Sequence, residues 1–245
     1  MRDRHAGILD RSTAWYRLLK QRDQPVLAFL GFGLLITLLG LVFAILGSEV
    51  LEGETRAFDL HILKAAKSLR DASPALAESM RDVTALGSVA VLVAISLFVA
   101  CYLLQLSNRR MALLVVAAAL SGSLAVTLLK AGFGRLRPDP GLAHLVVSGA
   151  AFPSAHASMS AVVYLTIAAL IASLRSSRAE RVLILTTAAL LSLLVGISRI
   201  ILGVHWPTDV IAGWTFGTAW ALLWVLLYET IAYRVRLAAT ANSSR

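Results

Sequence analysis

Long apolar runs separated by short polar segments make up most of this 245-residue sequence. About 20 consecutive apolar residues cross the hydrocarbon core of a bilayer as a helix, whose backbone groups are all hydrogen-bonded internally. Six runs approach this length, at residues 26–47, 87–106, 111–129, 157–174, 182–197 and 208–228. The pattern therefore predicts an all-α fold, an integral membrane bundle of six transmembrane helices.

The segment between the first two runs, residues 48–86, has a helical pattern of its own. Apolar residues recur at helical spacing in its first half, at Phe58, Ile62, Ala66 and Leu69, with the cations Arg56, Lys64, Lys67 and Arg70 between them. A second short helix is indicated by Ser73-Pro74, an N-cap residue followed by proline in the first turn. We expect a pair of short interfacial helices on the external face that shape the entrance to a site without a catalytic role of their own.

The composition and charge agree with a membrane protein. With 58% hydrophobic and 15% charged residues and a mean hydropathy of +0.77, the chain is far more apolar than a soluble domain. The net charge of +9 comes from basic residues before the first run and after the second, fourth and sixth: Arg2, Arg4, Arg11, Arg17, Lys20, Arg22, Arg109, Arg110, Arg175, Arg178, Arg181, Arg234 and Arg236. Six crossings put these segments on one side, so the positive-inside rule places both termini in the cytoplasm. We therefore expect the membrane, and no nucleic acid, as the partner.

The chain is expected to form a single membrane domain over residues 1–245. A basic cytoplasmic N-terminal segment at 1–24 precedes a six-helix core at 25–228, and a cytoplasmic tail follows at 229–245. The first 24 residues are polar and the first apolar run is long enough to span, so no cleavable signal peptide is expected. The single cysteine, Cys101, falls inside a predicted span and offers no intrachain disulfide.

A polar interruption between the last two runs, residues 198–209, concentrates ionisable groups where apolar residues would be expected. Pro207 suits the first turn of a helix, which places His205 and Asp209 four residues apart on one face. The carboxylate can then accept from one ring nitrogen and leave the other with a lone pair, as in a histidine nucleophile or base. Arg199 lies six residues before His205 and can hold an anion. Two interpretations are equally open from this segment alone: a catalytic site, or a helix cap beside an arginine at the membrane edge.

Two further polar clusters flank the loop between the third and fourth runs. Lys130, Arg135 and Arg137 fall within eight residues, a charge density suited to a strongly anionic group. Snorkelling to lipid phosphates would account for one or two of these cations. The second cluster is Pro153-Ser154-Ala155-His156, in which Ser154 is placed to cap the fourth helix and the first amides of that helix to cradle a phosphate.

The predicted topology brings these three clusters together. The third helix exits at Lys130, the fourth enters at Ser154, the fifth exits at Ser198 and the sixth enters near His205. All of them therefore lie on the external face. This agreement favours one functional site over unrelated charges at the membrane edge.

With this arrangement the sequence resembles the type 2 phosphatidic acid phosphatase (PAP2) superfamily, membrane lipid phosphatases that share an active site with vanadium haloperoxidases. The family signature is a lysine followed seven residues later by Arg-Pro, then Pro-Ser-Gly-His, then Ser-Arg followed by five residues, a histidine, three residues and an aspartate. The matching residues are Lys130 with Arg137-Pro138, Pro153-Ser154-Ala155-His156, and Ser198-Arg199 with His205 and Asp209. Every spacing is kept, and only Ala155 departs, standing where the family usually has glycine. A positive φ at Ala155 would strain the loop by roughly 1 kcal/mol, whereas a helical or extended conformation costs nothing.

The resemblance implies a role for each matched residue. His205 would attack phosphorus to give a phosphohistidine while Asp209 fixes its tautomer. His156 would protonate the departing lipid oxygen and then activate the water that hydrolyses the intermediate. The phosphate would be bound by Lys130, Arg137, Ser154, Arg199 and the backbone at Ala155. No cofactor and no metal is implied, and no carboxylate cluster lies near these motifs in the sequence.

The family resemblance predicts a hydrolase but leaves the reaction partner and the lipid open. The haloperoxidase branch is disfavoured because those enzymes are soluble. A phosphotransferase would use the same phosphohistidine with a lipid acceptor, and a non-catalytic binder or transporter of lipid phosphates would need the cations but not the two histidines and the aspartate together. Undecaprenyl diphosphate and phosphatidylglycerol phosphate are the favoured substrates, with phosphatidic acid and lipid A 1-phosphate as alternatives. The topology suggests a bacterial inner membrane, with the active site facing the periplasm.

Overall fold

The computed structural model describes residues 3–145 and 147–243, with side chains over residues 27, 29–145 and 147–234. All regular structure in these residues is helical. Its elements are α1 (Asp3–Glu52), α2 (Arg56–Ala72), α3 (Pro74–Ala85), α4 (Val89–Gln105), α5 (Arg109–Phe133), the 3₁₀ helix η1 (Pro140–Leu142), α6 (Ala155–Ser173), α7 (Arg178–Ile201) and α8 (Pro207–Ser243). The predicted all-α fold is confirmed.

Most of the predicted spans are long, apolar helices. Within the described residues, five segments are long and apolar enough to cross a membrane: Phe29–Glu52, Arg109–Phe133, Ala155–Ser173, Arg178–Ile201 and Pro207–Arg234. The remaining predicted span, 87–106, corresponds to α4, which has only 17 residues. It reaches spanning length only together with α3, from which it is bent by 41°. The protein is therefore an integral membrane protein with five spans, or six if this bent pair counts as one.

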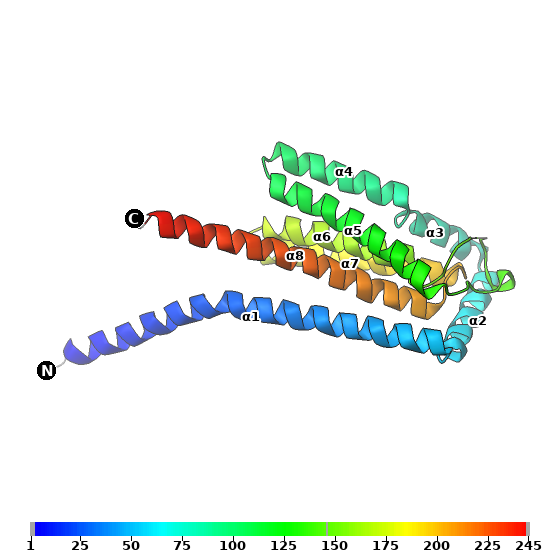
Figure 1. Cartoon of the computed structure of the whole chain (residues 1–245), viewed down its shortest axis with the longest axis horizontal. Helices are drawn as coiled ribbons and strands as arrows, with labels where there is room; N and C mark the ends of the chain where they lie inside the picture. Colours follow the sequence, from blue (N-terminus) through cyan, green and yellow to red (C-terminus); the bar gives the residue numbers. More distant parts are fainter. Residues whose placement is uncertain (1–2, 146, 244–245) are drawn as a thin grey trace.

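Helix α6 lies at the centre of the bundle and packs against α4, α5, α7 and α8 (Figure 1). Its contact with α8 is unusually close because Gly213 and Gly217 lie four residues apart on the facing side of α8. A Cβ at Gly217 would come within 2.4 Å of the Ser158 carbonyl oxygen. Small residues at this spacing let two membrane helices approach at backbone distance. The result is a tightly fixed pair whose first turns both reach the site.

The bundle has two different ends (Figure 1). At one end lie the start of α1, the end of α8 and the turns α4–α5 and α6–α7, whereas α2, α3, residues 134–145 and residues 147–154 gather at the other, the loop end. Helix α1 runs the length of the bundle beside α8. At the loop end it is joined to the core by an aromatic cluster in which the ring of Phe43 contacts Phe133, Phe152 and Phe216.

The two short helices predicted in the external segment are present, as α2 and α3. Phe58 and Leu69 are exposed, and the buried residues of α2 are Asp59, Leu63, Ala66 and Arg70. A helix at a membrane surface can direct its apolar residues to lipid and its polar residues to protein partners. Helix α2 therefore places an aspartate, Asp59, and an arginine, Arg70, against the bundle.

Candidate active site

The site is built at the loop end by three chain segments that change direction there. Helix α5 ends at Phe133, and the left-handed conformation of the next residue, Gly134, turns the chain toward Arg137. Helix α7 ends in a turn at Gly203, where φ is +71° and an added Cβ would come within 2.2 Å of the Leu142 carbonyl oxygen. Only glycine fits this turn without displacing the loop. The turn delivers His205 to the start of α8, which begins at Pro207 as the sequence predicted.

His205 and Asp209 form a buried pair at the first turn of α8. Nδ1 of His205 lies 3.3 Å from Oδ2 of Asp209, and the same carboxylate oxygen accepts from the Trp206 backbone N–H at 2.9 Å. The two side chains are 2% and 0% exposed. The predicted pairing four residues apart is therefore present in the structure.

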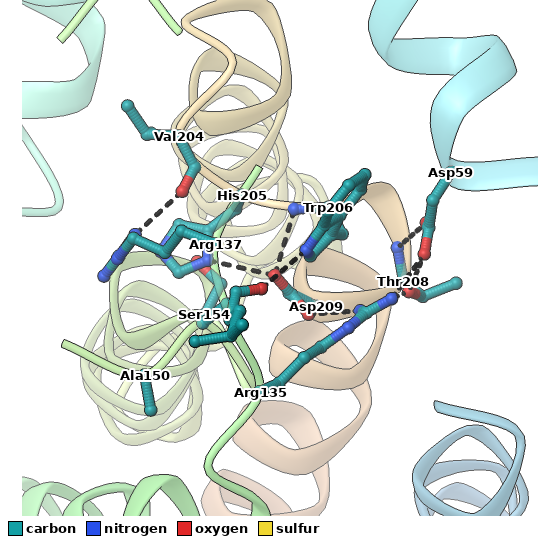
Figure 2. A network of polar contacts seen from close by, with 12 residues as sticks. Asp59, Arg135, Arg137, Ala150, Ser154, Val204, His205, Trp206, Thr208 and Asp209 are labelled. Carbon is teal, nitrogen blue, oxygen red and sulfur yellow. Dashed lines mark hydrogen bonds and ion pairs between the residues drawn. The ribbon is translucent and has the colours of Figure 1, made fainter. Parts of the chain in front are cut away.

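The tautomer of His205 follows from its other neighbour. Nη1 of Arg137 lies 3.1 Å from Nε2 of His205 (Figure 2). A guanidinium can only donate, so Nε2 accepts and the ring proton is on Nδ1, directed at Asp209. This tautomer leaves the nucleophilic lone pair on the nitrogen that faces Arg137.

His205 is kept neutral by its surroundings. Burial lowers the pKa of His205 well below its ordinary value of 6.5, and the charges of Arg137, Arg199 and Lys130 act in the same direction. The backbone of Ala151 acts against them as a smaller effect. At neutral pH the ring therefore carries a lone pair at Nε2.

Two further polar groups of the predicted phosphate site have hydrogen-bonding capacity that no protein group uses. Within the described residues, the buried Nε of Arg199 and the buried hydroxyl of Ser154 have no partner. Ser154 occupies the N-cap position of α6 as predicted, but its side chain does not make the cap hydrogen bond. Buried polar atoms are rarely left unpaired in proteins. These two are therefore available to oxygen atoms of a bound anion.

The cations of the site are held by backbone and hydroxyl oxygens. Lys130 Nζ donates to the Ala150 carbonyl at 2.6 Å, and Arg137 Nη1 donates to the Val204 carbonyl at 2.7 Å. Arg199 donates from Nη1 to the Thr84 hydroxyl of α3 at 2.9 Å. None of these acceptors is charged, so the positive charge of the three side chains is not neutralised by them. The cluster is suited to a dianion.

His156 lies in the first turn of α6. It packs beside Gly87, where an added Cβ would meet the His156 ring at 3.1 Å. Ala155 is the first residue of the helix, and it is not among the residues with positive φ. The alanine in place of glycine therefore introduces no backbone strain, and helix-terminal amides can still be offered to an anion.

An apolar groove connects the site with the side of the bundle. A cavity of about 380 Å³ lies between α4, α5 and α6, and Lys130 and His156 form its polar end. Successive turns of α5 line it through Thr127, Ser123 and Leu120. The groove offers an apolar surface to a chain attached to a phosphate at the Lys130 end.

The network behind Asp209 was only partly foreseen. Arg135 belongs to the predicted cation cluster, yet it contacts carboxylates: Nη1 lies 2.5 Å from Oδ1 of Asp209 and Nη2 lies 2.7 Å from Oδ2 of Asp59 (Figure 2). Of the three clustered cations, Arg135 is the one that two buried carboxylates flank, and it was not among the residues assigned to the phosphate. Asp59 was missed. A signal was present, since Asp59, Leu63, Ala66 and Arg70 share one helical face.

The described residues contain no group of three or more histidine, cysteine, aspartate or glutamate side chains placed to hold a metal ion. The acids nearest the site, Asp59 and Asp209, are separated by Arg135, which pairs with both.

Comparisons with known proteins agree with this geometry. A sequence model of the PAP2 superfamily matches residues 110–233. Phosphatidylglycerophosphatase B of Bacillus subtilis is 33% identical over 179 residues, 72% of this chain and 86% of that protein. The crystal structure of the PAP2 type phosphatidylglycerolphosphate phosphatase from Bacillus subtilis superposes with a TM-score of 0.75 at 31% identity, covering 80% of this chain and 96% of the other. LpxE of Aquifex aeolicus gives a TM-score of 0.53 at 25% identity, with coverages of 68% and 93%.

Proposed function

The chain belongs to the PAP2 superfamily of membrane lipid phosphatases, and we propose that it hydrolyses phosphatidylglycerol phosphate through a phosphohistidine formed on His205. The observation that supports the mechanism most directly is the 3.1 Å separation of His205 Nε2 from Arg137 Nη1. At this distance the lone pair of the neutral His205 faces Arg137, a proposed phosphate ligand. The choice of lipid rests on the similarity to phosphatidylglycerophosphatase B. Of the two substrates favoured from the sequence, this similarity supports phosphatidylglycerol phosphate over undecaprenyl diphosphate.

In the first proposed step, His205 Nε2 forms a bond to phosphorus as the bond to the lipid oxygen breaks. His156 gives its proton to that oxygen, so the lipid leaves as a neutral alcohol. The imidazole now carries a positive charge, which Asp209 stabilises through Nδ1–H. Lys130, Arg137 and Arg199 bind the equatorial oxygens, where charge is distributed in the transition state.

In the second step, water attacks the phosphorus of the phosphohistidine. His156, now neutral, accepts a proton from the water as the P–N bond breaks. Inorganic phosphate leaves, and His205 recovers its lone pair. His156 therefore acts as acid and then as base, which requires it to face the lipid side of the phosphorus. Its place at the polar end of the groove agrees with this role.

We assign the groove between α4, α5 and α6 to the apolar tail of the substrate. A lipid phosphate that enters from the side of the bundle keeps its acyl chains in an apolar environment while the phosphate reaches Lys130 and His156. Moving a charged head group out of water costs free energy, and the attraction of the cations that bind the phosphate offsets this desolvation cost. The hydrolysis of a lipid anchored in the membrane then requires no extraction of the whole molecule.

The site is proposed to face the periplasm of a bacterial inner membrane. Both termini leave the bundle at the end opposite the site (Figure 1), and the basic segments of the sequence belong to that terminal end. The positive-inside rule places such an end in the cytoplasm. Substrate would therefore be taken from the outer leaflet.

Product analysis with a panel of lipids tests the proposed function. Purified protein is mixed with phosphatidylglycerol phosphate, undecaprenyl diphosphate, phosphatidic acid and lipid A 1-phosphate in separate detergent assays, and inorganic phosphate and lipid products are measured. We expect the highest kcat/KM for phosphatidylglycerol phosphate, with one phosphate released for each phosphatidylglycerol formed. Loss of substrate without phosphate release, accompanied by a newly phosphorylated lipid, would identify a phosphotransferase instead. Preference for another lipid of the panel would overturn the substrate assignment.

A further inference from the structure

A second layer of charged residues lies behind the His205–Asp209 pair. Asp59 of α2 is fully buried, and its two oxygens accept from Thr208, from the backbone N–H at 3.0 Å and from the hydroxyl at 2.8 Å. Arg135 lies between Asp59 and Asp209 and also donates to the Thr208 hydroxyl at 2.8 Å (Figure 2). Neither residue belongs to the three motifs that indicated the family.

These contacts fix the plane of the Asp209 carboxylate. Oδ2 accepts from the Trp206 backbone and faces His205, whereas Oδ1 accepts from Arg135. A carboxylate held at one oxygen can rotate about its terminal bond, which is a broad torsion. Arg135 removes that freedom, so Oδ2 stays directed at Nδ1 of His205.

This layer holds one cation between two carboxylates, so it carries a net negative charge. Arg135 is 14% exposed at its side chain, and the two carboxylates that it bridges are fully buried. An unpaired buried charge is strongly unfavourable, so Arg135 stabilises Asp209 as an anion. Asp59 offsets much of the Arg135 charge, which leaves Asp209 able to support a positive charge developing on His205. The alternative, an Arg135 without Asp59, would compete with His205 for Asp209.

From this geometry we propose that Arg135 and Asp59 are positioning residues, which hold Asp209 in place for His205 and connect the external helix α2 to the chemical step. The proposal rests on the proposed role of His205 as the nucleophile. Neither side chain lines the groove. Arg135 contacts Asp209 directly, and Asp59 is connected to Asp209 through Arg135, so both are proposed to act through Asp209. Helix α2 thereby has an effect on catalysis that its position at the membrane surface did not suggest.

Steady-state kinetics of Arg135→Gln and Asp59→Asn, with Arg56→Gln as the matched control, separate positioning from general surface charge. Arg56 and Arg135 lie over the same Trp206 ring, at 5.8 Å and 5.4 Å, but only Arg135 contacts Asp209. We expect kcat to fall by about 10- to 100-fold in both test variants, the size seen for the carboxylate partners of metal-bound histidines. KM should stay unchanged because the phosphate ligands are untouched. Arg56→Gln should keep the wild-type kcat.

A double-mutant cycle with Asp209→Asn shows whether Arg135 acts through Asp209. If it does, adding Arg135→Gln to Asp209→Asn changes kcat by no more than about twofold, the size of ordinary non-additivity. Losses in kcat that multiply would overturn the proposal. A rise in KM with kcat unchanged would overturn it as well. Arg135→Lys keeps the buried charge and serves for the same cycle if Arg135→Gln does not fold, which the thermal unfolding of the purified protein reports. Retained turnover in His205→Ala would instead overturn the proposed function, independently of this cycle.

Discussion

Nη1 of Arg137 lies 3.1 Å from Nε2 of His205, so the arginine donates to the lone pair that in-line attack on phosphorus requires. In the proposed mechanism, binding of a phosphate transfers this donor from the histidine to a phosphate oxygen. One residue then fixes the tautomer of the nucleophile and afterwards stabilises the transferred group. In this mechanism, the binding of substrate itself frees Nε2 of His205 for attack.

The first prediction concerns pH. Protonation of His205 removes the nucleophile, and because burial and the nearby cations lower the pKa of His205, the ring stays neutral below pH 6.5. We expect an acid limb well below pH 6.5 in kcat/KM, which reports His205 in the free enzyme, and an alkaline limb in kcat, which reports mainly loss of the His156 proton in the complex with bound phosphate. As the two histidines interact, the limbs give macroscopic values.

Arg137→Gln tests the cause of that shift. Removing this charge should raise the pKa of His205, so the acid limb of kcat/KM should move to higher pH as overall activity falls. Arg56→Gln, which changes a cation outside the site, should leave the limb in place. An acid limb that does not move in Arg137→Gln, or that lies above pH 6.5 in the wild type, would contradict the electrostatic account.

The second prediction concerns the groove for the lipid tail. Ser123→Trp places a large ring in the cavity of about 380 Å³, and we expect it to raise KM for long-chain substrates. A water-soluble short-chain phosphate ester does not need the groove, so its kcat/KM should change little. Leu124→Trp is the matched control, because Leu124 is 61% exposed and does not line the cavity. Equal effects of the two tryptophans, or equal effects on both substrates, would contradict the assignment.

The sequence predicted the elements of the site better than their contacts. The family motifs fix the interval from Lys130 to Arg137 and that from Arg199 to His205, and helix ends near these positions bring the motifs to one face. Arg135 is only two residues from Arg137, yet a loop of irregular backbone directs the two guanidinium groups to different partners. Spacing along a helix predicts direction, whereas spacing along a loop does not.

Helix α2 shows a second limit of sequence pattern. Its apolar residues indicated an interfacial helix, and Phe58 and Leu69 are exposed. That pattern did not show that the face toward the protein carries Asp59 and Arg70. Arg70 donates to the carbonyls of Ile201 at 2.5 Å and Leu142 at 3.0 Å, which ties α2 to the end of α7 and to η1. Those acceptors are backbone atoms more than 70 residues away, which no local pattern identifies.

The third prediction concerns inhibition. Orthovanadate should inhibit competitively, since a five-coordinate vanadium bound to His205 imitates the in-line transition state, and such analogues bind far more tightly than substrates. The chelator EDTA should leave turnover unchanged. Loss of activity in EDTA that added magnesium restores would show that a metal ion performs the work assigned to Lys130, Arg137 and Arg199.

The fourth prediction concerns sidedness. In sealed right-side-out membrane vesicles, turnover should follow the pH of the outside buffer and ignore that of the lumen. A cysteine introduced at Gly141, an exposed position in the loop before the site, should react with an impermeant reagent added outside, in a background where Cys101 is replaced. Labelling only from the inside would show that the site faces the cytoplasm and that the positive-inside assignment is wrong.

The central claim, that His205 is the nucleophile, is tested most directly by trapping the phosphoenzyme. Purified protein is mixed with substrate carrying labelled phosphate, quenched in alkali within the first turnover, and its bound label is measured before and after acid treatment. We expect an acid-labile phosphoprotein in the wild type, a trace of it in Asp209→Asn, whose turnover falls by up to about 10⁴-fold, and none in His205→Ala, which should be inactive. Substantial turnover by His205→Ala, or label that remains bound to it, would contradict the mechanism.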